Sequence, residues 1–165
     1  MSKVATRERI LDGALEVFAR KGYHRAVVDD IAARLAGAVA AAVGARQGAL
    51  PKVEGALAAA LATFAGNERL ARLILLEAVS LGPVYQAKRS EVAGRFAALI
   101  QGYLDEAVAD GSIQHLDTRV ATLAWLGAVN EIVTQWLHGE VPDLAATIPA
   151  FTRVLLRSIG AGPKE

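Results

Sequence analysis

The chain has 165 residues, of which 53% are apolar and 5% aromatic, with a formal net charge of +1 and no cysteine. This length supports one sizeable core or two small ones. The absence of cysteine excludes a disulfide framework, thiolate catalysis and cysteine-based zinc sites, and the near-neutral charge alone does not indicate nucleic-acid binding.

Two short helices are predicted in the first 35 residues. Thr6 is a suitable N-cap, apolar residues recur at helical spacing from Ile10 to Phe18, and Gly22 is the usual residue past a helix end. Residues 28–35 predict a second helix. The following stretch, 36–45, is rich in Ala and Gly, which weakens a helix prediction there. We therefore divide the chain into residues 1–35 and 36–165.

Five longer helices are expected in the second part, because Pro and Gly punctuate its apolar periodicity. They cover residues 51–65, 68–81, 84–110, 118–138 and 142–159, with Gly111 and Gly139 ending two of them. The helix at 118–138 is apolar on nearly all sides, so we expect it to be buried on several faces. Alanine and leucine dominate the apolar residues and favour helix. The expected fold class is all-α, with a small N-terminal helical unit and a larger bundle.

The polar N-terminus lacks a signal-peptide apolar stretch, and no apolar run approaches the ~20 residues of a membrane span. We expect a soluble, cytoplasmic protein with no membrane association.

A motif with a recognisable register occupies the N-terminal unit. Residues 6–23 read TRERILDGALEVFARKGY, and residues 28–32 read VDDIA. Together they closely resemble the opening of TetR-family transcriptional regulators. The resemblance implies a helix-turn-helix whose third helix enters the major groove of operator DNA. It also implies backbone phosphate contacts, which position a protein without reading sequence, from Thr6, Arg7, Tyr23, His24 and Arg25.

The family pattern is interrupted after this block. Residues 36–43, AGAVAAAV, resemble the middle of the family's fourth helix, so the recognition helix and the start of the fourth helix are missing. We infer that roughly thirty residues are absent between about Ala32 and Arg34. The cause is a natural deletion, an engineered deletion, or the omission of a disordered segment from the sequence. We favour the omission. A rival alignment places the turn and recognition helix at residues 44–50. In addition, Ala26 and Val27 replace the threonines that usually cap the second helix.

The C-terminal part resembles regulatory domains of the same family more loosely, through residues 69–79 (RLARLILLEAV), Gly82-Pro83 and Phe96. The resemblance implies a small apolar or amphipathic effector bound inside the bundle. The alternative for the aromatic side chains is simple core packing, and for Glu77 an internal hydrogen bond, a dimer contact or solvent exposure. The pocket candidates are Leu73, Leu76, Glu77, Tyr85, Arg89, Phe96, Ile100, Tyr103, Trp125 and Val129.

Small residues line one side of the helix at 118–138, and the last helix is apolar. The resemblance implies a two-fold homodimer built from these two helices of each subunit, which suits a palindromic operator. The interface candidates are Ala121, Ala124, Gly127, Ala128, Glu131, Phe151 and Leu155.

No catalytic or metal-binding pattern is recognisable. The three histidines have no carboxylate at metal-ligand spacing, and neither a Gly-rich phosphate loop nor an HExxH sequence occurs. We expect no cofactor, no metal and no enzyme activity. The leading hypothesis is a ligand-responsive repressor released from operator DNA by its effector. The alternative is a helical ligand-binding and dimerisation module that has lost DNA binding, and a small helical enzyme has the least support.

Overall fold

The computed structural model describes residues 29–30, 32–77 and 83–161, and all regular structure within these ranges is helical. A first helix covers residues 32–44. It is followed by α2 (Ala49–Ala65), α3 (Glu68–Arg72), a π-helical turn η1 (Leu73–Glu77), α4 (Pro83–Ala109), α5 (Thr118–Leu137) and α6 (Leu144–Ser158). The all-α prediction is confirmed. The predicted helix at residues 6–22 and the phosphate contacts from Thr6, Arg7, Tyr23, His24 and Arg25 lie outside the described residues.

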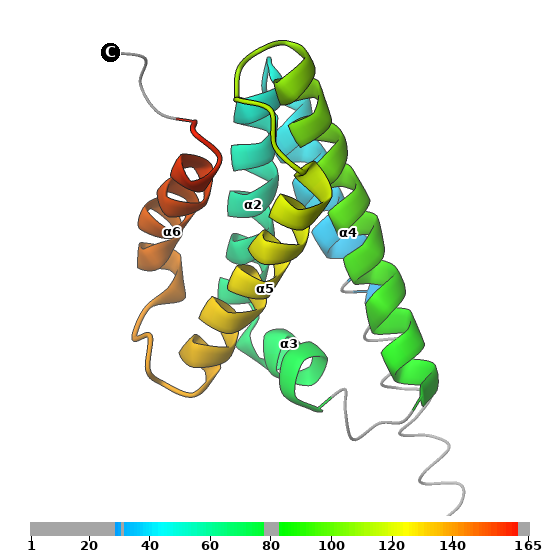
Figure 1. Cartoon of the computed structure of the whole chain (residues 1–165). Helices are drawn as coiled ribbons and strands as arrows, with labels where there is room; N and C mark the ends of the chain where they lie inside the picture. Colours follow the sequence, from blue (N-terminus) through cyan, green and yellow to red (C-terminus); the bar gives the residue numbers. More distant parts are fainter. Residues whose placement is uncertain (1–28, 31, 78–82, 162–165) are drawn as a thin grey trace, which may run out of the picture.

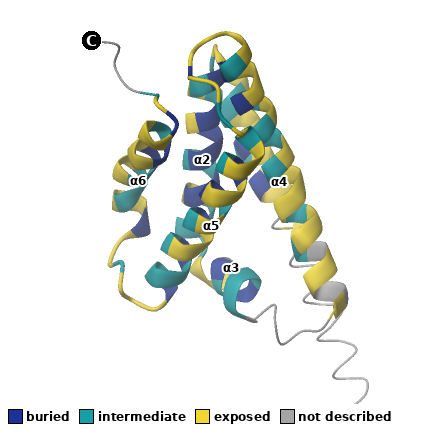
Figure 2. Cartoon of the chain, in the orientation of Figure 1, coloured by how far each residue is buried: buried dark blue, intermediate teal, exposed yellow. Residues whose placement is uncertain are grey.

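Helix α2 lies at the centre of the bundle. It packs against α6 on one side and α4 on the other, while α5 crosses in front and α3 lies across the lower end (Figure 1). Its inward positions, Val53, Ala56, Leu57, Ala60 and Leu61, are at most 2% exposed. Three of them are larger side chains that fill space, and two are alanines that allow neighbouring helices to approach closely. Figure 2 shows this burial along α2, in contrast to the exposed first half of α4.

Aspartate caps and glycine turns define the ends of the C-terminal helices. The carboxylates of Asp117 and Asp143 each accept a backbone N–H at 3.0 Å, from Val120 and Ala146, and so satisfy one unpaired donor of α5 and α6. Gly111 follows α4 and has a φ of 75°, a conformation that glycine adopts without steric strain. The predicted helices at 84–110 and 118–138 are thereby confirmed, with shifts of one residue at their ends.

The connection between the first helix and α2 is held by Arg46. Its guanidinium donates to the carbonyl oxygen of Ala42 at 2.7 Å, at the C-terminal end of the first helix. The same guanidinium covers Gly55 of α2, where a Cβ atom would lie 2.7 Å from its Nη1. Gly55 therefore provides the close approach that allows one arginine to join two helices.

The structure corrects the prediction for residues 36–45. The helix that contains Leu35 continues to residue 44 despite its glycines. Leu35 and Val39 are buried against the bundle, and this packing overrides the low helix propensity of Gly37, where a Cβ atom would meet nothing within 4 Å. The proposed boundary between residues 35 and 36 falls inside this helix and stays a prediction.

Uninterrupted helix also occupies the position where the recognition helix is expected to be missing. Residues 32–34 are consecutive helical residues, and Arg34 pairs with Asp30 at 2.9 Å across this position. The rival alignment at residues 44–50 is wrong. These residues form a turn and the start of α2, whose Ala49 is 4% exposed, so this helix faces the core and not DNA.

Helix α5 is buried on one side only. Trp125, Val129 and Val133 face the core, but Val120 and Leu123 are 60% and 58% exposed. The expectation of burial on several faces is therefore wrong for the single chain. No helix of the described ranges combines the length and hydropathy of a membrane span.

Candidate ligand-binding cavity

A narrow cavity of about 90 Å³, partly open to solvent, lies between α4 and α5. This volume is below the usual range of about 300–1,000 Å³ for small-molecule sites, so a ligand of that size requires the surrounding helices to move apart. It extends from the first helix and α2 to the π-helical turn. Its lining consists of Ala32, Leu35, Ala60, Phe64, Ile74, Leu75, Arg89, Val92, Ala93, Phe96, Leu126, Val129 and Asn130.

The wall that α4 contributes follows from helical periodicity. Arg89, Val92, Ala93 and Phe96 are spaced by three or four residues, so they form one stripe facing the cavity. The small side chain of Ala93 leaves space between its larger neighbours. Seven residues of α-helix place the Cα atoms of Arg89 and Phe96 about 10 Å apart along the axis. The stripe therefore has a charged end and an aromatic end.

Two polar side chains interrupt the apolar lining. Arg89 is half-buried, and Asn130 is exposed at the edge of α5. Within the described part of the chain, Arg89 makes no ion pair with a carboxylate. An arginine beside an apolar cavity is a good partner for a carboxylate or phosphate, because its planar guanidinium donates several hydrogen bonds to such groups. The cavity therefore suits a ligand with an apolar body and an anionic end.

The opposite wall is formed by the π-helical turn. Ile74 and Leu75 of η1 line the cavity immediately after α3. Single π-helical turns inside α-helices are uncommon and occur frequently at functional sites.

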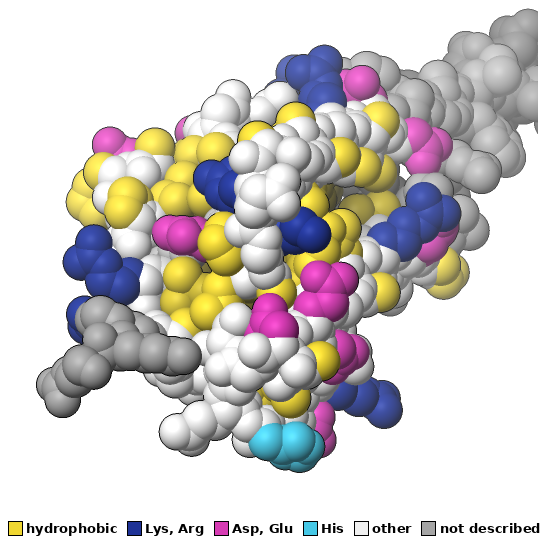
Figure 3. Space-filling model, turned by 90° about the horizontal axis from the view of Figure 1, so that it is seen from above, with side chains coloured by type: hydrophobic (Ala, Val, Ile, Leu, Met, Phe, Trp, Pro, Cys, Tyr) yellow, Lys and Arg dark blue, Asp and Glu magenta, His cyan; other side chains and the backbone are white. Residues whose placement is uncertain are grey.

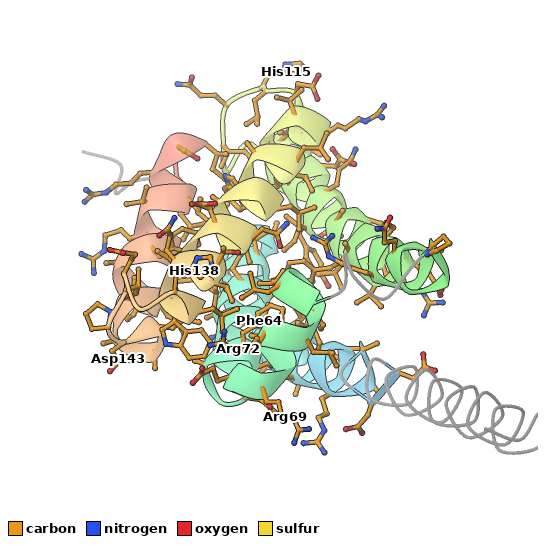
Figure 4. All side chains as sticks on the ribbon, turned by 90° about the horizontal axis from the view of Figure 1, so that it is seen from below. Phe64, Arg69, Arg72, His115, His138 and Asp143 are labelled. Carbon is orange, nitrogen blue, oxygen red and sulfur yellow. The ribbon has the colours of Figure 1, made fainter. Side chains whose placement is uncertain are left out.

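Arg72 of α3 holds this wall against α5. It donates to the Leu137 carbonyl oxygen at 3.2 Å and pairs with Glu68 at 2.9 Å. Figure 4 shows Phe64 and Arg72 where α2, α3 and the end of α5 meet.

Three of the predicted pocket residues line the cavity: Arg89, Phe96 and Val129. Leu73, Ile100 and Trp125 are buried elsewhere in the core, because at their helical positions they face other helices. The Trp125 indole N–H donates to the Ser158 hydroxyl of α6 at 3.2 Å.

Two more of the predicted pocket residues, Leu76 and Tyr103, are partly buried against the core and do not line the cavity. The ammonium of Lys52 lies 5.3 Å from the centre of the Tyr103 ring. The side chains of Glu77 and Tyr85 lie outside the described set.

Several lining residues were not predicted from the sequence. Val92 and Ala93 follow from the spacing that begins at Arg89, so this signal was available. Ile74 and Leu75 face the cavity because of the π-helical turn, whose larger number of residues per turn changes which residues point inward. A periodicity of 3.6 residues does not predict that change.

A second hollow lies between the first helix and α4, with a volume of about 400 Å³. We call it the interhelical groove. It shares four lining residues with the cavity: Ala32, Leu35, Val92 and Phe96. Its remaining lining consists of Asp29, Ala33, Ala36, Val39, Ala40, Glu91, Arg95 and Leu99. Arg95 and Glu91 form an ion pair at 2.7 Å on its edge.

The predicted interface residues lie on α5 and α6 but differ in exposure. Ala124, Gly127 and Glu131 are exposed, whereas Ala121, Ala128 and Phe151 are half-buried and Leu155 is 6% exposed. Leu155 therefore belongs to the core of the chain. The large hydrophobic side chains exposed in the described part are Val120, Leu123 and Val154, which the sequence analysis did not select.

The charged and histidine side chains of the described residues do not gather into a catalytic or metal-binding cluster. His115 and His138 are exposed on different parts of the molecule (Figure 4), and no group of three potential metal ligands is found in the ranges described. On the face in Figure 3, acidic and basic side chains are interspersed with hydrophobic ones. The Ser112 side chain and backbone N–H both bond to the Asp110 carboxylate and hold the pKa of that carboxyl below its ordinary value.

Comparison with known proteins identifies relatives of both halves of the chain. Residues 10–43 match the model for bacterial regulatory proteins of the tetR family. Residues 46–140 match the tetracyclin repressor-like C-terminal domain. No curated protein matches the sequence significantly.

Three solved structures have a similar fold. A bacterial regulatory protein in the tetR family from Rhodococcus RHA1 has a TM-score of 0.73 and 17% identity, over 86% of this chain and 75% of that one. The transcriptional regulator FadR from Bacillus subtilis, in complex with stearoyl-CoA, has a TM-score of 0.67 and 19% identity, over 82% and 74%. The fatty acid degradation regulator FadR from Bacillus halodurans has a TM-score of 0.61 and 22% identity, over 85% and 72%.

Proposed function

Because the chain belongs to the TetR family of bacterial regulatory proteins, we propose that it is a repressor released from operator DNA by a small amphipathic effector. The observation that carries this proposal is the apolar cavity between α4 and α5, with Arg89 and Asn130 as its polar side chains. We exclude an enzymatic function, because the members of this family are regulators. A regulator of this kind acts in the cytoplasm, where it reaches chromosomal DNA.

The effector is an unbranched apolar chain with an anionic end. Apolar side chains form most of the cavity wall, and covering them contributes about 0.8 kcal/mol for each buried methylene of a ligand. Arg89 supplies the partner for a carboxylate or a phosphate group. The Bacillus subtilis FadR structure contains stearoyl-CoA, a ligand of this chemistry. This likeness of fold supports the same ligand class here.

Two copies of the chain associate through α5 and α6. Val120, Leu123 and Val154 are between 58% and 65% exposed in the single chain. Large apolar side chains grouped on neighbouring helices favour burial in an interface. A two-fold dimer also places two DNA-binding units at a fixed spacing, as a palindromic operator requires. An effector that changes the bundle shifts that spacing and lowers DNA affinity.

The DNA-binding unit of the functional protein includes a recognition helix. No such helix is found in the described residues. We therefore propose that the native protein carries a further segment near Ala32–Arg34. Intact mass spectrometry of the protein expressed from its own gene tests this point. A mass about 3 kDa above 17.3 kDa supports the proposal.

A mass of 17.3 kDa favours the second candidate, a ligand-binding and dimerisation module without DNA binding. The uninterrupted helix at residues 32–44 is the observation that supports this alternative.

The functional test measures binding of the full-length native protein to the DNA upstream of its own gene. We expect tight binding that weakens steeply with salt, since phosphate contacts release counterions. We also expect release by a long-chain fatty acid or its CoA thioester. The variant Arg89→Gln should retain DNA binding but require more effector for release. Absence of salt-sensitive DNA binding, or release that is equal for wild type and variant, contradicts the proposal.

A further inference from the structure

The cavity and the interhelical groove share part of their lining. Four residues line both hollows: Ala32 and Leu35 from the first helix, and Val92 and Phe96 from α4. Phe96 has the largest side chain of the four and is half-buried. It stands at the end of the α4 stripe opposite Arg89. The two hollows are therefore adjacent compartments, with the Phe96 ring as the largest obstacle between them.

We propose that Phe96 sets the maximum chain length of the effector by closing the cavity toward the interhelical groove. This inference rests on the proposed effector class, in which the anionic end lies at Arg89. A chain anchored there runs along Val92 and Ala93 and meets the Phe96 ring. Methylenes beyond that point find no apolar space inside the cavity. They would have to enter the groove, whose nearest walls are Val39 and Leu99.

The residues on either side explain why Phe96 decides the limit. Leu35 is 9% exposed and is part of the core, so its position is fixed by packing. Ala32 is too small to obstruct a chain. Val92 lies one turn closer to Arg89, beside the chain instead of at its end. Replacing Phe96 by a smaller residue therefore removes the largest side chain between the two hollows and joins them.

The expected effect can be stated for a homologous series of ligands. Each added methylene that is buried tightens binding about fourfold. In the wild-type protein, a plot of log Kd against chain length should fall steadily and then level off at the length that reaches Phe96. The position of this break is the measured quantity. It does not depend on the absolute affinity, and so it is insensitive to the identity of the natural head group.

The experiment measures Kd by isothermal titration for saturated fatty acids from 8 to 18 carbons and, separately, for their CoA thioesters. We compare wild type with Phe96→Ala and Phe96→Trp. Leu99→Ala is the matched control, since Leu99 lies one turn further along α4 and lines only the groove. Phe96→Leu is included because it keeps an apolar contact with the core and folds even where alanine does not. Circular dichroism establishes that each variant is folded.

The proposal predicts that the break moves to longer chains by at least two methylenes in Phe96→Ala, and by a smaller amount in Phe96→Leu. It predicts a shift to shorter chains in Phe96→Trp and no shift in Leu99→Ala. An unchanged break in all three Phe96 variants, or an equal shift in Leu99→Ala, overturns it while leaving the effector class intact. If wild type binds neither series at any length, the effector class itself is wrong, and this inference is wrong with it.

Discussion

The exposed apolar surface of α5 and α6 gives a quantitative prediction for the dimer. Leu123 is 58% exposed in the single chain, and full burial of a leucine side chain contributes about 1.5–3 kcal/mol. Covering it in an interface should therefore contribute about 0.9–1.7 kcal/mol per protomer. A two-fold dimer contains this contact twice. Leu123→Ser should therefore weaken dimerisation by about 1.7–3.5 kcal/mol, or roughly 20- to 400-fold in the dissociation constant.

Sedimentation equilibrium over a range of protein concentrations measures this dissociation constant directly. Val154→Ser, at a position that is 65% exposed on α6, should have a similar effect. The control is Ala98→Ser, an exposed position on α4 away from this surface, which should leave the constant unchanged. A wild-type chain that stays monomeric at high concentration refutes the reasoning. So does a dimer whose stability is the same with Leu123→Ser and Val154→Ser.

Three further predictions concern single contacts. Gly55→Ala should lower the free energy of unfolding by up to about 2 kcal/mol, since the new methyl displaces Arg46 from the Ala42 carbonyl oxygen. In an Arg46→Ala background, Gly55→Ala should instead raise the free energy of unfolding by about 1 kcal/mol, because alanine has the higher helix propensity. Urea denaturation of the single and double variants distinguishes these outcomes. Arg72→Gln should destabilise by about 1–3 kcal/mol, because the Leu137 carbonyl loses a charged donor, whereas Arg69→Gln, at an exposed α3 position, should have almost no effect. An NMR titration should place the pKa of Asp110 below its ordinary value of 3.8, and the Ser112→Ala variant should raise it. Because the pKa in the folded state is lowered, the stability that this carboxylate contributes is present above pH 3.8. It is lost as the pH falls through the folded-state pKa. An Asp110 pKa that does not respond to Ser112→Ala would contradict this assignment.

Much of the fold follows from short-range signals in the sequence. Asp117 before α5 and Gly111 after α4 specify helix ends through a capping carboxylate and a left-handed turn. The apolar composition of α5 led to the wrong expectation of burial on several faces, because spacing alone does not show that Val120 and Leu123 stay exposed in the single chain. The helix at residues 36–44 was not predicted, because its stability comes from burial of Leu35 and Val39 against other helices and not from local propensity.

The cavity was less predictable than the fold. Its wall is assembled from helices that are far apart in the sequence, so composition indicates apolar residues but not which of them meet. Trp125 is a plausible lining residue by type, yet its indole reaches Ser158 of α6. Arg89 and Phe96 were predictable because a charged residue and an aromatic one share a helical stripe. Ile74 and Leu75 required knowledge of the π-helical turn.

The location of a bound effector tests the central claim most directly. In crystals of the protein with a long-chain fatty acid brominated at its terminal carbon, anomalous diffraction locates the bromine and the electron density locates the carboxylate. The account predicts the carboxylate beside Arg89 and the bromine beside Phe96, with the chain between α4 and α5. Bromine found only at sites outside this cavity, or a ligand bound in the reverse direction, would contradict it.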